Sequence, residues 1–186
     1  ETSTNNQYRF TFPGREVKEE TIKTMVDQIR SFSPDYVVAS GSLPPGLPAY
    51  FYGLIVKNAA AAGAKCIVDT SGEALQALKG KHAYLIKPNI SELCNMLNIS
   101  RLDSNEIPKA AQQAVRDGFA EIIVVSMGPA GAWLVSNDVE YFIKAPVVKK
   151  KSTVGAGDSM VAGITAMLQK QRPLKEAIAF GVACGS

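Results

Sequence analysis

Apolar residues recur along this chain in two patterns, one with the spacing of a helix and one as short continuous runs. Ile22, Met25, Val26 and Ile29 lie three or four positions apart, which predicts an amphipathic helix over residues 16–32. Short apolar runs follow and indicate buried strands. These predicted strands are Tyr36–Ser40, Lys65–Asp69, Ala83–Ile86 and Glu121–Ser126.

Further segments fill the chain between and around these strands. Helical spacing or helix boundary signals predict helices at Ala49–Ala62, Glu73–Leu78 with Ser71 as its cap, Ser91–Leu97, Ile107–Val115, Asp158–Leu168 and Leu174–Ala183. Alternating residues predict a strand at Gln7–Phe12 and hairpin-like strands at Ala132–Ser136 and Tyr141–Ile143. Strands that alternate with helices predict an α/β fold of three layers, with a mainly parallel central sheet and helices on both faces. Without repeats or low-complexity stretches, residues 1–186 are expected to form one domain.

Polar segments follow four of the predicted strands at the point where each strand ends. They are Ser40-Gly41-Ser42, Asp69-Thr70, Lys87-Pro88-Asn89 and Ser126-Met127-Gly128. In open parallel sheets, ligands bind outside the carboxyl ends of the strands. Each segment alone has an ordinary explanation as a helix cap or a turn. Together, they predict a binding site at one edge of the sheet.

A glycine-rich turn near the end of the chain completes this site. Gly155, Ala156, Gly157 and Asp158 come directly before a predicted helix. The uncovered amides of a helix N-terminus can hold an anion, and Asp158 supplies a base beside it, which is what phosphoryl transfer to a hydroxyl requires. The alternative for these residues alone is a tight turn with a satisfied helix cap.

Composition and missing motifs narrow the class of protein. The chain has 186 residues, 46% of them hydrophobic, and a net charge of +3 with one histidine, so neither nucleic-acid binding nor a membrane-spanning segment is expected. Three widely spaced cysteines favour reduced thiols and a cytoplasmic protein. The P-loop, the dinucleotide fingerprint of Rossmann oxidoreductases and the esterase elbow are all missing.

Four motifs, taken in order, give the chain a resemblance to the ribokinase-like PfkB-type carbohydrate kinases over essentially its whole length. They are Ser40-Gly41-Ser42-Leu43-Pro44-Pro45-Gly46, Lys87-Pro88-Asn89-Ile90-Ser91-Glu92, Ser126-Met127-Gly128-Pro129-Ala130-Gly131-Ala132 and Ser152–Asp158. The first motif, with Val68–Leu75, is most similar to the branch that acts on phosphorylated ketohexoses, and within it to the 6-phosphofructokinases. The resemblance therefore implies ATP-dependent phosphorylation of fructose 6-phosphate.

The resemblance also implies roles for particular residues. Asp158 would be the catalytic base and contact the sugar, and the amides of Gly155, Ala156 and Gly157 would stabilise the transferred phosphoryl group. Ser42 would contact the sugar phosphate. The implied nucleotide-binding residues are Lys87, Asn89, Ser126, Gly128, Pro129, Ala130, Gly131 and Ser186.

Two metal sites belong to the same resemblance. Asn89 and Glu92 would organise Mg²⁺ near the nucleotide phosphates, through water, because Mg²⁺ gives up its own waters reluctantly. The backbone carbonyls of Ser152 and Val154 would bind a monovalent cation, K⁺ in most members of the family.

Both ends of the chain look cut, so it is interpreted as part of a longer kinase. In the family, the sugar-binding segment and the lid precede Glu1, and part of the adenine pocket follows Ser186. The lid is where members commonly dimerise, which implies a homodimer of the whole protein and an inactive isolated chain. Three alternatives remain open: 1-phosphofructokinase, tagatose-6-phosphate kinase, and a non-catalytic nucleotide-binding relative.

Overall fold

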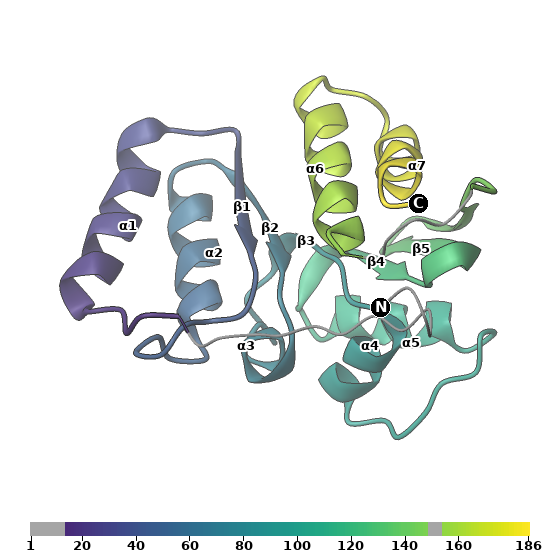
Figure 1. The fold of residues 1–186 in the computed structure, drawn as a ribbon, viewed down its shortest axis with the longest axis horizontal. Coiled ribbons are helices and arrows are strands. Elements are labelled where there is room, and N and C mark those ends of the chain that lie inside the picture. Colours follow the sequence, from purple (N-terminus) through teal and green to yellow (C-terminus); the bar gives the residue numbers. More distant parts are fainter. Residues whose placement is uncertain (1–13, 149–153) are drawn as a thin grey trace, which may run out of the picture.

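A six-stranded sheet forms the centre of the computed structural model, which describes residues 14–148 and 154–186. The strands follow one another across the sheet in the order of the sequence, and the first four run parallel while the last two complete antiparallel pairs (Figure 1). They are β1 (Tyr36–Ser40), β2 (Lys65–Asp69), β3 (Ala83–Ile86), β4 (Ala120–Ser126), β5 (Gly131–Ser136) and β6 (Glu140–Lys144). The mainly parallel sheet and the hairpin are confirmed.

Strand β1 is less buried than its apolar sequence predicted. Its residues are half-buried or exposed, and Val38 is 45% exposed. Among the described residues β1 pairs only with β2, so it forms one edge of the sheet. The expectation of a buried strand was therefore wrong, although the bounds of β1 were predicted correctly. The strand predicted at 7–12 lies outside the described residues.

Helices cover both faces of the sheet, as the pattern predicted. One face carries α1 (Glu19–Phe32), α2 (Phe51–Ala61), α3 (Gly72–Gln76), α4 (Ile90–Leu97) and α5 (Ile107–Arg116), and the other carries α6 (Ala156–Gln169) and α7 (Leu174–Cys184). Alternate strand residues enter two separate cores, because side chains of a strand point to opposite faces. Val68 packs with the first group of helices, whereas its neighbour Ile67 packs with α6 and α7.

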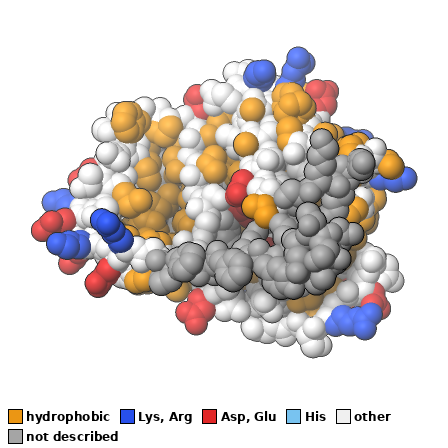
Figure 2. All heavy atoms as spheres, in the orientation of Figure 1, with side chains coloured by type: hydrophobic (Ala, Val, Ile, Leu, Met, Phe, Trp, Pro, Cys, Tyr) orange, Lys and Arg blue, Asp and Glu red, His pale blue; other side chains and the backbone are white. Residues whose placement is uncertain are grey.

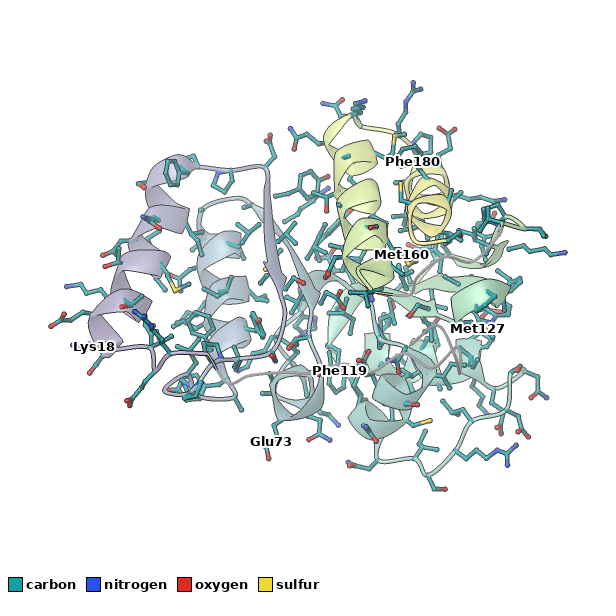
Figure 3. The ribbon with its side chains drawn as sticks, in the orientation of Figure 1. Lys18, Glu73, Phe119, Met127, Met160 and Phe180 are labelled. Carbon is teal, nitrogen blue, oxygen red and sulfur yellow. The ribbon has the colours of Figure 1, made fainter. Side chains whose placement is uncertain are left out.

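Helices α6 and α7 pack together through glycines, which fixes how α6 lies on the sheet. A Cβ atom on Gly181 would overlap the side chain of Ile164, and one on Gly163 would lie 2.9 Å from Cys184 Sγ. Met160, in the first turns of α6, lies on the side toward α7 (Figure 3). The N-terminal end of α6 is thereby held over the sheet.

One local expectation was wrong. Ser71 occupies the position before α3, but its side chain makes no capping hydrogen bond. Residues Gly128–Ala130, after β4, form a short 3₁₀-helix.

Candidate active site

The carboxyl ends of the parallel strands meet at one edge of the sheet. Ser40, the last residue of β1, pairs with Asp69, the last residue of β2. Ile86 at the end of β3 lies opposite Val68 on one side and Ile123 on the other. The structure therefore brings the four polar segments that follow these strands to the same edge, as the sequence predicted.

Asp69 and Lys87 form a largely buried ion pair at this edge. Lys87 Nζ lies 3.2 Å from Asp69 Oδ1, and the two side chains are 8% and 16% exposed respectively. Burial raises the pKa of the Asp69 carboxyl, the Lys87 ammonium lowers it by a smaller amount, and nearby Asp158 adds to the rise. The pair links β2 to the segment after β3.

The N-terminus of α6 lies directly beside this ion pair. Gly155 precedes the helix with a φ of 78°, a conformation that favours glycine, and no side chain caps the helix. The first amides of a helix have no partner within it. A Cβ atom on Gly157 would lie 3.3 Å from Lys87 Nζ, so the ammonium sits against the first turn. Asp158 is exposed in that turn.

Asp158 also lines a groove between β1 and α6. The groove has a volume of about 670 Å³ and includes Ser40 and Val38 from β1 and Thr165 from α6. Ser42 lines a different groove of about 700 Å³, which lies between β1 and the helices α1 and α2. Figure 2 shows hydrophobic side chains gathered in the area between α1 and the strands. The structure thus does not bring Ser42 into one groove with Asp158.

Asn89 and Glu92 are held in place by a capping box at the start of α4. Asn89 Oδ1 accepts a hydrogen bond from the Glu92 amide at 2.9 Å, and Glu92 Oε2 accepts one from the Asn89 amide at 2.8 Å. These contacts use the single side-chain oxygen of Asn89 and one of the two carboxylate oxygens of Glu92. Among the described residues no cluster of three or more His, Cys, Asp or Glu side chains could hold a metal ion. The side-chain oxygens of Asn89 and Glu92 therefore fit a cation that keeps its waters better than one that they bind directly.

Ser126 joins this segment to the end of β4. Its amide donates a hydrogen bond to the Pro88 carbonyl at 2.9 Å. Ser126 and Asn89 also form an isolated parallel β-bridge. The structure therefore brings Lys87, Asn89 and Ser126 together.

The remaining predicted nucleotide and cation residues lie farther along the chain. A Cβ atom on Gly131 would collide with the Ile143 carbonyl oxygen, so the β5–β6 hairpin itself requires this glycine. Gly128, Pro129 and Ala130 are exposed. Ser186 donates its hydroxyl to the Val182 carbonyl at 2.7 Å. Val154 is 61% exposed, and Ser152 lies outside the described residues.

Sequence reasoning placed Asp69 at this edge but gave it no role in the site, and it missed Tyr52. The hydroxyls of Tyr52 and Thr70 each donate to the Gly41 carbonyl at 2.8 Å, which holds the turn after β1 in place. The position of Asp69 at the end of an apolar run was visible in the sequence. Its pairing with Lys87 depends on the strand order, which the sequence did not predict.

The fold and the site, an uncapped helix N-terminus with an adjacent acid at the carboxyl edge of a mainly parallel sheet, are of the ribokinase-like type. A family model described as "pfkB family carbohydrate kinase" matches residues 1–186. The chain belongs to this family.

Particular relatives lie in its sugar-phosphate branch. The chain is 40% identical over 186 residues to ATP-dependent 6-phosphofructokinase isozyme 2 of Escherichia coli, covering 99% of this chain and 60% of that protein. It is 37% identical to 1-phosphofructokinase of Bacillus subtilis, covering 100% of this chain and 59% of that protein. The chain thus spans about three fifths of the length of these relatives.

Solved structures agree with the sequence comparison. Phosphofructokinase-2 from Escherichia coli matches with a TM-score of 0.91 and 40% identity over 99% of this chain, in a tetrameric inhibited form and in a complex with potassium. The chain covers 61% and 60% of those two chains. The predicted family is confirmed, and the relatives described above are phosphofructokinases.

Proposed function

We propose that the protein containing this chain transfers the γ-phosphoryl group of ATP to a hydroxyl of a phosphorylated ketohexose, with fructose 6-phosphate as the substrate. The observation that carries the proposal is the exposed carboxylate of Asp158 in the uncapped first turn of α6, beside the buried Lys87 ammonium. The 6-phosphofructokinase relative supports the choice of fructose 6-phosphate.

In the proposed reaction, the sugar hydroxyl oxygen attacks the γ-phosphorus while the Asp158 carboxylate takes the hydroxyl proton. The bond between the γ-phosphorus and the bridging oxygen breaks, and ADP leaves with the electron pair. The amides of Gly155, Ala156 and Gly157 donate hydrogen bonds to the transferred phosphoryl oxygens. Lys87 and Asn89 bind the remaining phosphates, and Ser126 with Gly128, Pro129, Ala130, Gly131 and Ser186 borders the nucleotide.

Asn89 and Glu92 would hold Mg²⁺ through water, and Ser152 and Val154 would hold K⁺ through their carbonyls. Bound Mg²⁺ neutralises charge on the nucleotide phosphates. The capping box supports the first site, because it fixes two oxygen-bearing side chains beside Lys87. The potassium complex of the Escherichia coli relative supports the second.

The remaining proposals concern the whole protein. Ser42 contacts the sugar phosphate once further parts of the site complete the groove around it. We expect a homodimer, although one structure of the Escherichia coli relative is a tetrameric inhibited form. Within the described residues no helix has the length and apolar character needed to cross a bilayer. A cytoplasmic location and an inactive isolated chain remain predictions.

Asp158→Asn in the full-length protein tests the proposal. Loss of general-base assistance is expected to lower kcat by about 10²- to 10⁴-fold and to leave the affinity for ATP nearly unchanged. Glu176→Gln is the matched control, because Glu176 is an exposed acid in the first turn of α7. An Asp158→Asn variant with near-normal turnover would show that Asp158 is not the base.

The substrate is tested by comparing kcat/KM for fructose 6-phosphate, fructose 1-phosphate, tagatose 6-phosphate and ribose, each with ATP and Mg²⁺. We expect the highest value with fructose 6-phosphate. A preference for fructose 1-phosphate would favour the activity of the Bacillus subtilis relative instead. Nucleotide binding without transfer to any sugar would favour the non-catalytic alternative.

A further inference from the structure

Asp69, which forms a buried ion pair with Lys87, is the residue of this edge to which the proposed function gives no role. Asp69 ends β2, and Lys87 directly follows β3, the neighbouring strand. Their side chains meet under the first turn of α6, where a Cβ atom on Gly157 would lie 3.3 Å from Lys87 Nζ and 3.9 Å from Asp69 Oδ2. Three elements far apart in the sequence therefore meet at one ammonium group.

A lysine side chain on its own is a poor choice for a fixed position. Its four-carbon stem has many rotamers, and its ammonium prefers water to the interior of a protein. Lys87 nevertheless has only 8% of its side chain exposed, and Asp69 is the only acid within salt-bridge distance of it among the described residues. The carboxylate provides both the counter-charge and a hydrogen-bond acceptor, so it fixes where the ammonium lies.

We propose that Asp69 is a positioning residue of this site: it holds the Lys87 ammonium beneath Gly157, so that the nucleotide phosphates bound beside the N-terminus of α6 meet a fixed cation. The proposal rests on the proposed function. Asp69 acts through Lys87 and needs no contact with the substrate. The glycine at position 157 leaves room for the Lys87 ammonium, because the Cβ atom of an alanine there would lie 3.3 Å from Nζ.

A purely structural role for Asp69 makes a different prediction. If the side chain only filled space between β2 and α6, the isosteric Asp69→Asn would be tolerated and the longer Asp69→Glu would be harmful. If the charge holds Lys87 in place, Asp69→Asn would be harmful and Asp69→Glu would be tolerated. The two substitutions therefore separate positioning from packing.

The experiment measures three quantities in the full-length protein for wild type, Asp69→Asn and Asp69→Glu. They are the rate at which an amine-acylating reagent labels Lys87, read by mass spectrometry; kcat and KM for ATP; and the melting temperature. In Asp69→Asn, we expect Lys87 to be labelled several-fold faster and kcat to fall about 10- to 100-fold, the range for a lost hydrogen bond to a charged group. In Asp69→Glu, we expect kcat and the protection of Lys87 from labelling to be close to those of wild type.

Asp117→Asn is the matched control, because the half-buried Asp117 forms an ion pair with the exposed Lys79 at 2.9 Å, away from this edge. It should leave kcat and the labelling of Lys87 unchanged. If Asp69→Asn does not fold, the Asp69→Glu variant decides the question. A kcat within about tenfold of wild type, with Lys87 still protected from labelling, supports positioning. A larger fall in kcat is the size expected for the loss of a hydrogen bond to a charged group. A larger fall, or a freely labelled Lys87, overturns it.

Asp69→Asn with unchanged kcat and unchanged labelling would also overturn the proposal. Failure of the proposed function would look different, because wild type itself would then transfer no phosphate to any of the four sugars. The labelling of Lys87 would still report whether Asp69 holds it.

Discussion

Cys66 lies in β2 with 3% of its surface exposed, whereas Cys184 is exposed at the end of α7. Burial raises the pKa of the Cys66 thiol from 9.0 to about 12. The thiolate is therefore disfavoured in the folded chain relative to the unfolded one. Between these two values the unfolded state binds fewer protons than the native state, so the free energy of unfolding falls as the pH rises.

We predict that this single group destabilises the fold above pH 9 by up to about 1.4 kcal/mol per pH unit. The measurement is the urea midpoint at several pH values for wild type and Cys66→Ala. Tyr36, Tyr52 and Tyr84 also have raised pKa values, so they contribute in the same direction in both proteins. A pH dependence equal in the two proteins would contradict the prediction.

Single residues also show where sequence reasoning stops. Gly155 and Gly157 looked equivalent in the sequence, as two glycines that keep a ligand site open. In the structure, Gly155 is required by its positive φ, and a Cβ there would meet nothing within 4 Å, whereas Gly157 has no such φ and leaves room for Lys87. That distinction depends on the side chain of Lys87, which comes from the segment after β3, so no local sequence pattern predicts it.

Among the elements, the capping box at α4 has a measurable effect on stability. Asn89→Ala removes the side-chain acceptor for the Glu92 amide and should lower the free energy of unfolding by about 1 kcal/mol. Ser71→Ala is the control, because Ser71 occupies the corresponding position of α3 without a capping hydrogen bond. Its change should stay within about 0.5 kcal/mol. Denaturant titration measures both, and equal losses would mean that the cap at Asn89 is not the cause.

The elements themselves were predicted well where local signals suffice. Strands β1, β2 and β3 have the predicted bounds, because each is an apolar run limited by polar or turn-forming residues. The degree of burial of β1 was wrong, since burial depends on which element lies beside a strand. The same holds for the site. The positions of Lys87 and Asn89 followed from the strand ends and that of Asp158 from the glycine-rich turn, whereas the ion pair with Asp69 required the strand order.

For the whole molecule, the edge at β1 predicts self-association of the isolated 186-residue chain. Apolar grooves lie on both sides of β1, and exposed strand edges with apolar surroundings pair with other chains. Val38→Lys places a charge on this strand and should shift the chain toward monomer in sedimentation experiments. Tyr50→Lys, at a 63% exposed position before α2, is the control. Association that is equally reduced by both substitutions would argue against β1 as the contact.

The sequential strand order has a consequence for how the chain folds. Every described strand pairs with the strand next to it in the sequence, so each pairing closes only the loop, or the one or two helices, between them. Short closures cost less entropy and speed folding, and domains begin to fold from the N-terminal end during synthesis. Within the described residues, the strands from β1 to β6 can therefore join the sheet one at a time, in the order of the sequence. Asp158 would reach its place after the edge that receives it has formed.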